Sequence, residues 1–445
     1  MNNLKVAAAV ALALGGTMAT QAAFASPTAA QCATPGASLY VAGSSAAQPS
    51  FATALANDLF DSTGETTIAA PAVTGSANGN FKAYCGLAKA GNGAGVATGT
   101  VTTVFYRAEG GSVVGALPIA ANKPIKFLNL TLAGCAVTNP SVVGLSATVG
   151  TTDGWSGCVA EHAVEMGVTD LEPAQFHTPN YPSAYSATVF GSATQAQLAA
   201  LTQTPLFQQV FGLFVNTSGI NGLGTGQAID LTRETAAAVL SGGYGDWSAV
   251  PTATGGVVSS TSQPITIVNR EAGSGTRTGA SIYFLGTNCV SFPGTLLDPS
   301  PLNDGYATGD VLATAAATPG AITYASIDNN GKQAALTMAS LSGVAPTNLA
   351  ATNGGYDWWF EATAQKGTIT SPGGLGIYNW LIGGELANVA TAPHAKDILA
   401  IANVGTNTSA VPATGTASTV GGVTIYINPF TKAGNSCSIP SNTNL

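Results

Sequence analysis

Residues 265–285 combine a positively charged side chain with hydroxyl groups at the predicted start of a helix. A β-branched strand leads into Arg270, the turn Gly-Ser-Gly-Thr follows at 273–276, and an apolar-periodic helix continues from it. At a helix N-terminus the unpaired backbone N–H groups and the helix dipole favour negative charge. We therefore expect an oxyanion to bind beside Arg270, Ser274 and Thr276. Taken alone, the turn is also an ordinary helix start with Ser274 as its N-cap.

Two further glycine-and-serine turns follow the same strand-to-helix pattern. The first is Gly-Ser-Ser at 43–45, between a strand at 38–42 and a helix with apolar residues spaced by four. The second is Glu-Gly-Gly-Ser at 109–112. Ser45 and Ser112 are candidate ligand groups, although serine is also a preferred helix cap. Three such turns suggest convergence on one crevice at the carboxyl ends of strands.

The remaining pattern alternates strands with helices and predicts an α/β fold. Residues 210–216 and 321–327 are strand-like, and a helix is expected within 230–243, with Asp230 or Thr232 as its cap. The two tryptophans at 358–359, and Trp247, are interpreted as packing residues, not as a sugar platform.

The N-terminus has the pattern of a cleaved secretory signal. Lys5 precedes an apolar stretch at 6–14, and Ala-Phe-Ala at 23–25 precedes Ser26. Removing 25 of the 445 residues leaves 420, and losing Lys5 changes the formal charge from −8 to −9. No later run is apolar enough to span a membrane. Only 8% of residues are charged, with no basic patch for nucleic acid. We expect a soluble periplasmic or secreted protein.

The chain has six cysteines, an even number that predicts three disulfides in an oxidising compartment. Short loop closure favours Cys135 with Cys158, and a bond between Cys289 and Cys437 would pin the C-terminal tail; spacing alone allows fifteen pairings. Metal binding is the weaker alternative, because no CxxC pattern occurs and the three histidines lie far from any thiol pattern. We expect no metal and no cofactor. The other two cysteines are Cys32 and Cys85.

Seven landmarks in a fixed order carry a family resemblance: GSSAAQP, EGGS, EMGVTDLEP, FGLFVN, a helix ending in GDWSAV, NREAGSGTR and PGAITY. In this order they resemble the periplasmic phosphate-binding proteins of ABC importers. They span roughly 39–324; the tail from about 360 resembles the family less clearly, and 85–101 and 121–158 look like insertions.

The resemblance implies a type II periplasmic-binding fold, in which two α/β domains close on a ligand. Crossover strands would lie near 206–216 and 356–362. The expected division is a signal peptide at 1–25, domain I at 26–208 plus 360–445, and domain II at 209–359.

The resemblance also assigns ligand groups in both domains. Asp170 would accept a proton from the ligand, which hydrogen phosphate can offer and sulfate cannot at neutral pH. Asp170 could instead cap a following helix that contains Pro173 and Phe176. The full expected ligand set is Ser45, Ala46, Ser112, Asp170, Arg270, Ser274, Gly275 and Thr276.

Some residues depart from the family pattern. Ala272 stands where an aspartate often orients the ligand arginine, with Glu271 beside that arginine instead. Glu109 would bring an acid close to the anion unless it pairs with Arg107, and Arg277 could add a second positive group. The ligand is therefore expected to be phosphate or a related oxyanion.

Catalysis is not expected, because the sequence contains no GxSxG nucleophile elbow and no visible triad pattern. Two functions remain. The first is a monomeric solute receptor that closes on an oxyanion and delivers it to an ABC permease. The alternative is a secreted or surface protein that uses the binding-protein fold for adhesion or other interactions. Convergence of the candidate ligand residues on one crevice favours the receptor.

Overall fold

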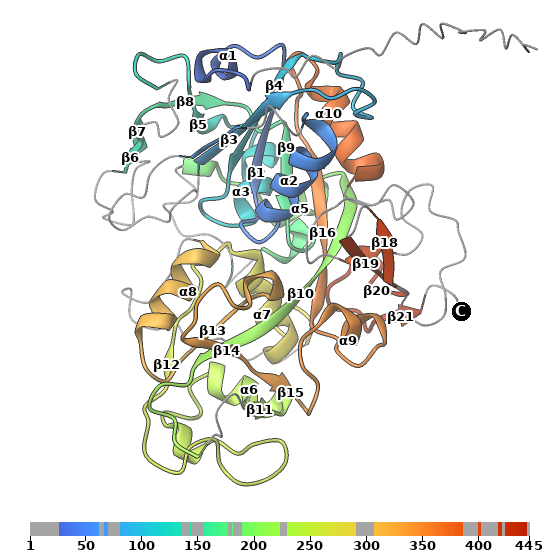
Figure 1. Ribbon diagram of the computed structural model, residues 1–445. Coiled ribbons are helices and arrows are strands. Elements are labelled where there is room, and N and C mark those ends of the chain that lie inside the picture. Colours follow the sequence, from blue (N-terminus) through green and yellow to red (C-terminus); the bar gives the residue numbers. More distant parts are fainter. Residues whose placement is uncertain are drawn as a thin grey trace, which may run out of the picture.

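The computed structural model (Figure 1) describes residues 26–61, 66–69, 81–135, 142–144, 155–176, 180, 189–222, 229–290, 307–385, 399–401, 417–420 and 423–442. The predicted signal peptide, His177 and His394 lie outside these ranges. The fold is mixed α/β, as predicted, and its largest sheet contains thirteen of the described strands.

One half of this sheet is built around β1 (Ala37–Gly43), which pairs in parallel with β4 (Val101–Arg107) and β9 (Met166–Thr169). Beyond β4 lie β3 (Phe81–Leu87) and β2 (Thr66–Ala69), both antiparallel to their neighbours. Leu39 and Val41 share a core with α2 (Gln48–Ala54) and α10 (Gly374–Trp380), whereas Ala42 packs with α3 (Val113–Ala120). Alternate β1 residues therefore bury against helices on opposite faces.

The long strand β10 (Gln203–Asn216) joins this half of the sheet to the other (Figure 1). Its residues up to Val210 pair with β16 (Trp359–Lys366), and those from Phe211 pair with β13 (Ala321–Ser326). The predicted crossover segments 206–216 and 356–362 overlap β10 and β16, respectively. Further pairing to β13 and β10 comes from β12 (Thr266–Ile267) and β14 (Leu336–Met338), respectively.

Helices also cover both faces of the second half. One core contains residues of α6 (Arg233–Leu240) and α7 (Gly275–Leu285), and another contains α8 (Thr308–Ala317). Thr232 caps α6, so the alternative cap Asp230 is wrong; Asp230 lies instead in β11 (Asp230–Leu231). The tryptophans at 247, 358 and 359 are at most 1% exposed, which confirms their interpretation as packing residues.

Three disulfides are present: Cys32–Cys85, Cys135–Cys158 and Cys289–Cys437. The two pairings favoured from the sequence are thus confirmed. Among the helices of the described ranges, none is both long and apolar enough to cross a bilayer.

Smaller elements complete the described fold. Three strands extend the edge of the large sheet beyond β10: β17 (Leu399–Ile401), β18 (Ala417–Val420) and β19 (Val423–Asn428). The remaining helical elements are α1 (Ala29–Ala33), η1 (Leu55–Leu59), η2 (Pro173–Gln175), α5 (Gln195–Ala199), η3 (Trp247–Ala249), η5 (Ile327–Asn329), α9 (Asn348–Thr352) and η6 (Leu381–Glu385). The remaining strands are β5 (Ile125–Leu128), β6 (Val142–Gly144), β7 (Trp155–Gly157), β8 (Val159–His162), β15 (Ser340–Leu341), β20 (Phe430–Thr431) and β21 (Ser441–Asn442).

Candidate functional site

The starts of four helices meet where the two halves of the sheet face each other. Ser45, before α2, lies 3.1 Å from Thr308 of α8 between hydroxyl oxygens. The backbone N–H of Val113, at the start of α3, donates to Gly273 O, just before α7, over 3.0 Å. The three predicted turns therefore converge, and the start of α8 joins them. Four helix N-termini around one point favour an anion there.

Ser44 and Ser45 play different roles in the first turn. Ser44 is fully buried; its hydroxyl donates to Asp170 and accepts from the backbone N–H of Ala47 at 2.9 Å. Ser45 instead contacts Thr308. Its alternative role as a helix cap is wrong, because Ala47 occupies the N-cap position of α2. Ala46 is buried, and its carbonyl accepts from Gln209 at 2.9 Å.

The second turn places a buried hydroxyl beside the carboxylate. Ser112 Oγ accepts from the backbone N–H of Asp170 at 3.2 Å. Ser112 stands at the N-cap position of α3, as its alternative role as a cap requires, but its side chain makes no capping hydrogen bond. Glu109 pairs with Arg107 at 2.5 Å, and Arg107 is fully buried. This confirms the structural interpretation of that pair.

Asp170 directly follows β9 and is 3% exposed. Its carboxylate accepts hydrogen bonds from Ser44 and, at 3.2 Å, from Thr276 Oγ1. The capping alternative is wrong, because Glu172 is the N-cap residue of η2. Burial raises the pKa of the Asp170 carboxyl, while the hydrogen bond from Ser44 and the charge of Arg270 act in the opposite direction. Ionising the buried Asp170 carboxyl therefore costs free energy.

Arg270 brings a guanidinium to the same place and is 1% exposed. Its Nη1 donates to Thr308 Oγ1 at 3.2 Å. Burial lowers the pKa of Arg270, and the charges of Glu271 and Asp170 counteract this effect. The side chain of Arg277 donates to the backbone oxygen of Arg270 at 2.8 Å. Arg277 thus supports the loop that carries Arg270.

The third turn places Thr276 and Gly275 directly against the opposite wall. Ser274 caps α7 by accepting from the backbone N–H of Arg277 at 3.3 Å. A Cβ on Gly275 would lie 2.3 Å from Ser112 Oγ and 2.8 Å from Asp170 Oδ2. Only glycine allows this close approach, since contacts below 3.0 Å force something to shift.

The assembled site has the chemistry of an oxyanion receptor. Hydroxyl groups and helix N-termini supply neutral donors, and Arg270 supplies one positive charge. Asp170 adds a carboxylate, which only accepts hydrogen bonds when it is ionised. The structure brings together seven of the eight predicted ligand residues, whereas Ala46 contacts Gln209 through its carbonyl. It adds Ser44 and Thr308, which sequence reasoning missed: Ser44 stood within the quoted turn, whereas no strand-turn-helix pattern marked Thr308.

Comparison with protein-family models shows that residues 183–371 match the PBP superfamily domain. This confirms the predicted relationship to binding proteins of that superfamily over this part of the chain. No curated protein matches the chain.

Among solved structures, the chain is similar to a putative phosphate ABC transporter substrate-binding protein with bound phosphate from Clostridium perfringens. The identity is 15% over 77% of this chain and 92% of that chain, with a TM-score of 0.43. A phosphate binding protein from Stenotrophomonas maltophilia is 14% identical over 80% of this chain and 98% of that chain, with a TM-score of 0.38. PstS from Borrelia burgdorferi is 13% identical over 74% of this chain and 87% of that chain, with a TM-score of 0.33.

Proposed function

We propose that this chain, which carries a PBP superfamily domain over residues 183–371, is an exported receptor that binds phosphate or a related oxyanion for ABC import. The observation that carries the proposal is that Asp170 accepts a hydrogen bond from Thr276 of α7 and feels the positive charge of Arg270. Asp170 lies in the half of the fold built on β1, and Arg270 precedes α7 in the other half. A ligand that contacts both residues links the two halves, which is how a two-domain receptor closes.

Asp170 selects for a ligand that carries a proton. Because burial raises the pKa of this carboxyl, its ionised form gains from an additional hydrogen-bond donor. Hydrogen phosphate has a P–OH group that can donate, whereas sulfate has only acceptors at neutral pH. Two acceptors facing each other in a buried site repel, so sulfate is disfavoured.

Convergence also favours one of the two functions inferred from the sequence. An adhesion or interaction protein has no need for a buried guanidinium and carboxylate among four helix N-termini. The buried positions of Ser112, Asp170 and Arg270 therefore favour the receptor. The three disulfides suit an oxidising compartment, and we place the protein in the periplasm or outside the cell as a monomer.

Equilibrium dialysis with radiolabelled orthophosphate tests this function. We expect the purified mature protein to bind phosphate and the variant Arg270→Ala to lose binding by at least about 100-fold, as removal of a buried charge-assisted contact predicts. Arg233→Ala is the matched control, because the Arg233 side chain donates to Tyr283 O, outside the site. Equal phosphate binding by the Arg270→Ala variant and the wild-type protein refutes the assignment.

A further inference from the structure

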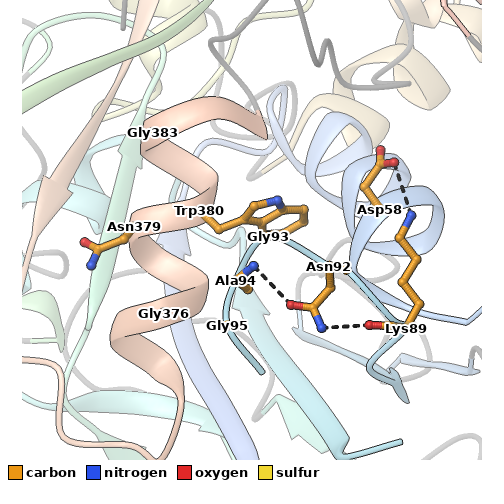
Figure 2. Close-up of a pocket in the computed structure, with 11 residues that line it drawn as sticks. Asp58, Lys89, Asn92, Gly93, Ala94, Gly95, Gly376, Asn379, Trp380 and Gly383 are labelled. Carbon is orange, nitrogen blue, oxygen red and sulfur yellow. Dashed lines mark hydrogen bonds and ion pairs between the residues drawn. The ribbon is translucent and has the colours of Figure 1, made fainter. Parts of the chain in front are cut away.

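A second pocket shares no lining residue with the oxyanion site. It lies between α10 and the connection from β3 to β4 (Figure 2). Its volume is about 680 Å³, within the range of small-molecule sites. The lining includes Trp380, at the end of α10, and the glycine-rich loop 91–95.

The loop that forms one wall is held in a fixed shape by Asn92. This side chain is 5% exposed and donates to Lys89 O at 2.8 Å and to Val96 O at 2.7 Å. Its oxygen accepts from the backbone N–H of Ala94 at 3.0 Å. Because the Asn92 side chain hydrogen-bonds to backbone groups of the same loop, this wall of the pocket is formed without a ligand.

Glycines leave the pocket lined by bare backbone next to the indole of Trp380. A Cβ on Gly93 would lie 2.9 Å from Trp380 Cδ1, so the loop rests directly against the ring. Gly91 and Gly95 have φ of 69° and 70°, and a Cβ on either would meet nothing within 4 Å. A ligand can therefore approach both the half-buried indole and the backbone at these two positions.

The charged groups of the pocket cancel each other. Lys89 Nζ lies 3.4 Å from Asp58 Oδ1 and donates to Asn57 O at 2.6 Å. The two side chains remain 32% and 20% exposed, and both reach the pocket, as Figure 2 shows. One carboxylate beside one ammonium offers donors and acceptors without a net charge. An anion of the kind expected at Arg270 is not favoured here.

We propose that this pocket binds a neutral saccharide. A sugar ring has an apolar C–H face that can stack on the Trp380 indole, and hydroxyl groups around its edge. Those hydroxyls fit the mixed donors and acceptors of Lys89, Asp58 and the exposed loop backbone. A saccharide site on an exported protein would attach it to surface or cell-wall glycan without involving the oxyanion site.

Saturation-transfer NMR and calorimetry with maltotriose, triacetylchitotriose and lactose test this proposal. We expect at least one of the three to bind the full-length mature protein. Trp380→Leu removes the stacking surface, and Gly91→Asn adds a side chain at a pocket-lining position, where a Cβ meets nothing within 4 Å and where asparagine tolerates the φ. We expect each variant to weaken binding at least tenfold while phosphate binding and thermal unfolding stay as in the wild type.

Three results would overturn it: no binding of any of the three oligosaccharides, unchanged binding in the Gly91→Asn variant, or binding of adenosine at Trp380 in place of a sugar. If Trp380→Leu unfolds, Gly91→Asn decides alone, because that substitution does not touch the packing of the indole.

Discussion

Thr276 Oγ1 donates a hydrogen bond to Asp170 Oδ2 at 3.2 Å and so joins α7 to the end of β9. Both residues are almost completely buried. The contact connects the carboxylate that is proposed to select the ligand with the helix whose N-terminus is proposed to hold it. Substitutions at this contact should therefore affect both the closure of the two halves on the ligand and the selectivity for phosphate over sulfate.

Thr276→Val should weaken phosphate binding by roughly tenfold. The substitution keeps the side-chain shape but leaves Asp170 with one donor fewer, at a cost of about 1–3 kcal/mol. Thr278→Val is the matched control, because the Thr278 hydroxyl donates within α7 to Ser274 O at 2.9 Å. Calorimetric titration of both variants measures the difference, and equal affinities for phosphate would contradict the role given to Thr276.

Asp170→Asn should stabilise the ligand-free protein at neutral pH. Burial raises the folded pKa of Asp170 above its usual value of 3.8. The ionised carboxylate therefore lowers stability once the pH exceeds the folded pKa, and this effect is absent below 3.8. We expect urea unfolding at about pH 7 to give a higher free energy of unfolding for the variant than for the wild type. The gain should shrink towards pH 4.

Asp246→Asn provides a control of opposite sign. Hydrogen bonds from Ser248 and Ser262 lower the pKa of the half-buried Asp246. Its ionised form adds stability above the unfolded pKa, so this variant should lose stability at neutral pH, and the loss should shrink on acidification. If both variants change the free energy of unfolding in the same direction at pH 7, the electrostatic role given to Asp170 is wrong.

The same Asp170→Asn variant should lose selectivity between phosphate and sulfate. An amide no longer repels sulfate oxygens and can donate to them. We expect the ratio of the two dissociation constants to fall at least tenfold, mainly through tighter sulfate binding. Competition dialysis measures this ratio, and an unchanged ratio would assign selectivity to another residue.

Gly275→Ala should abolish phosphate binding, because the added methyl group would overlap Ser112 and Asp170. Gly309, in the first turn of α8, is the matched control: a Cβ there would meet nothing within 4 Å. Gly309→Ala should bind as the wild type and gain about 0.5–1 kcal/mol of helix stability. Normal binding by the Gly275→Ala variant would show that the two walls do not approach as closely as described.

The C-terminal segment should slow ligand release. Ser436 donates through its backbone N–H to Glu172 at 2.8 Å, and the next residue, Cys437, is bonded to Cys289 beyond the end of α7. The segment thus ties the region after Asp170 to the helix of the opposite wall. Replacing Cys289 and Cys437 with serine should raise the phosphate dissociation rate several-fold and cost about 2–4 kcal/mol of stability.

Stopped-flow release of labelled phosphate measures this rate. Replacement of Cys32 and Cys85, whose bond joins α1 to β3, is the control and should lower stability without changing release. Equal release rates in both double variants would show that the C-terminal segment does not restrain opening.

Local strand-turn-helix patterns predicted Ser112 and Arg270, whereas Asp170 was assigned from the family resemblance. The sequence predicted Ser45 and missed Ser44, which lies in the same turn. The Ser44 hydroxyl contacts Asp170 and the Ser45 hydroxyl contacts Thr308, and residue spacing cannot show which of the two reaches the carboxylate. Thr308 was not predicted, because the N-cap residue of α8 is Ala307, which has no capping side chain to mark the start of the helix. The Trp380 pocket depends on contact between a loop and a helix distant in sequence.

A crystal structure of the mature protein grown with equimolar phosphate, in otherwise phosphate-free buffer, tests the central claim most directly. The account predicts one phosphate between Arg270 and Asp170, with Thr276 and Ser112 on its two sides. Phosphate bound elsewhere on the chain, with these four residues contacting only one another, would contradict it.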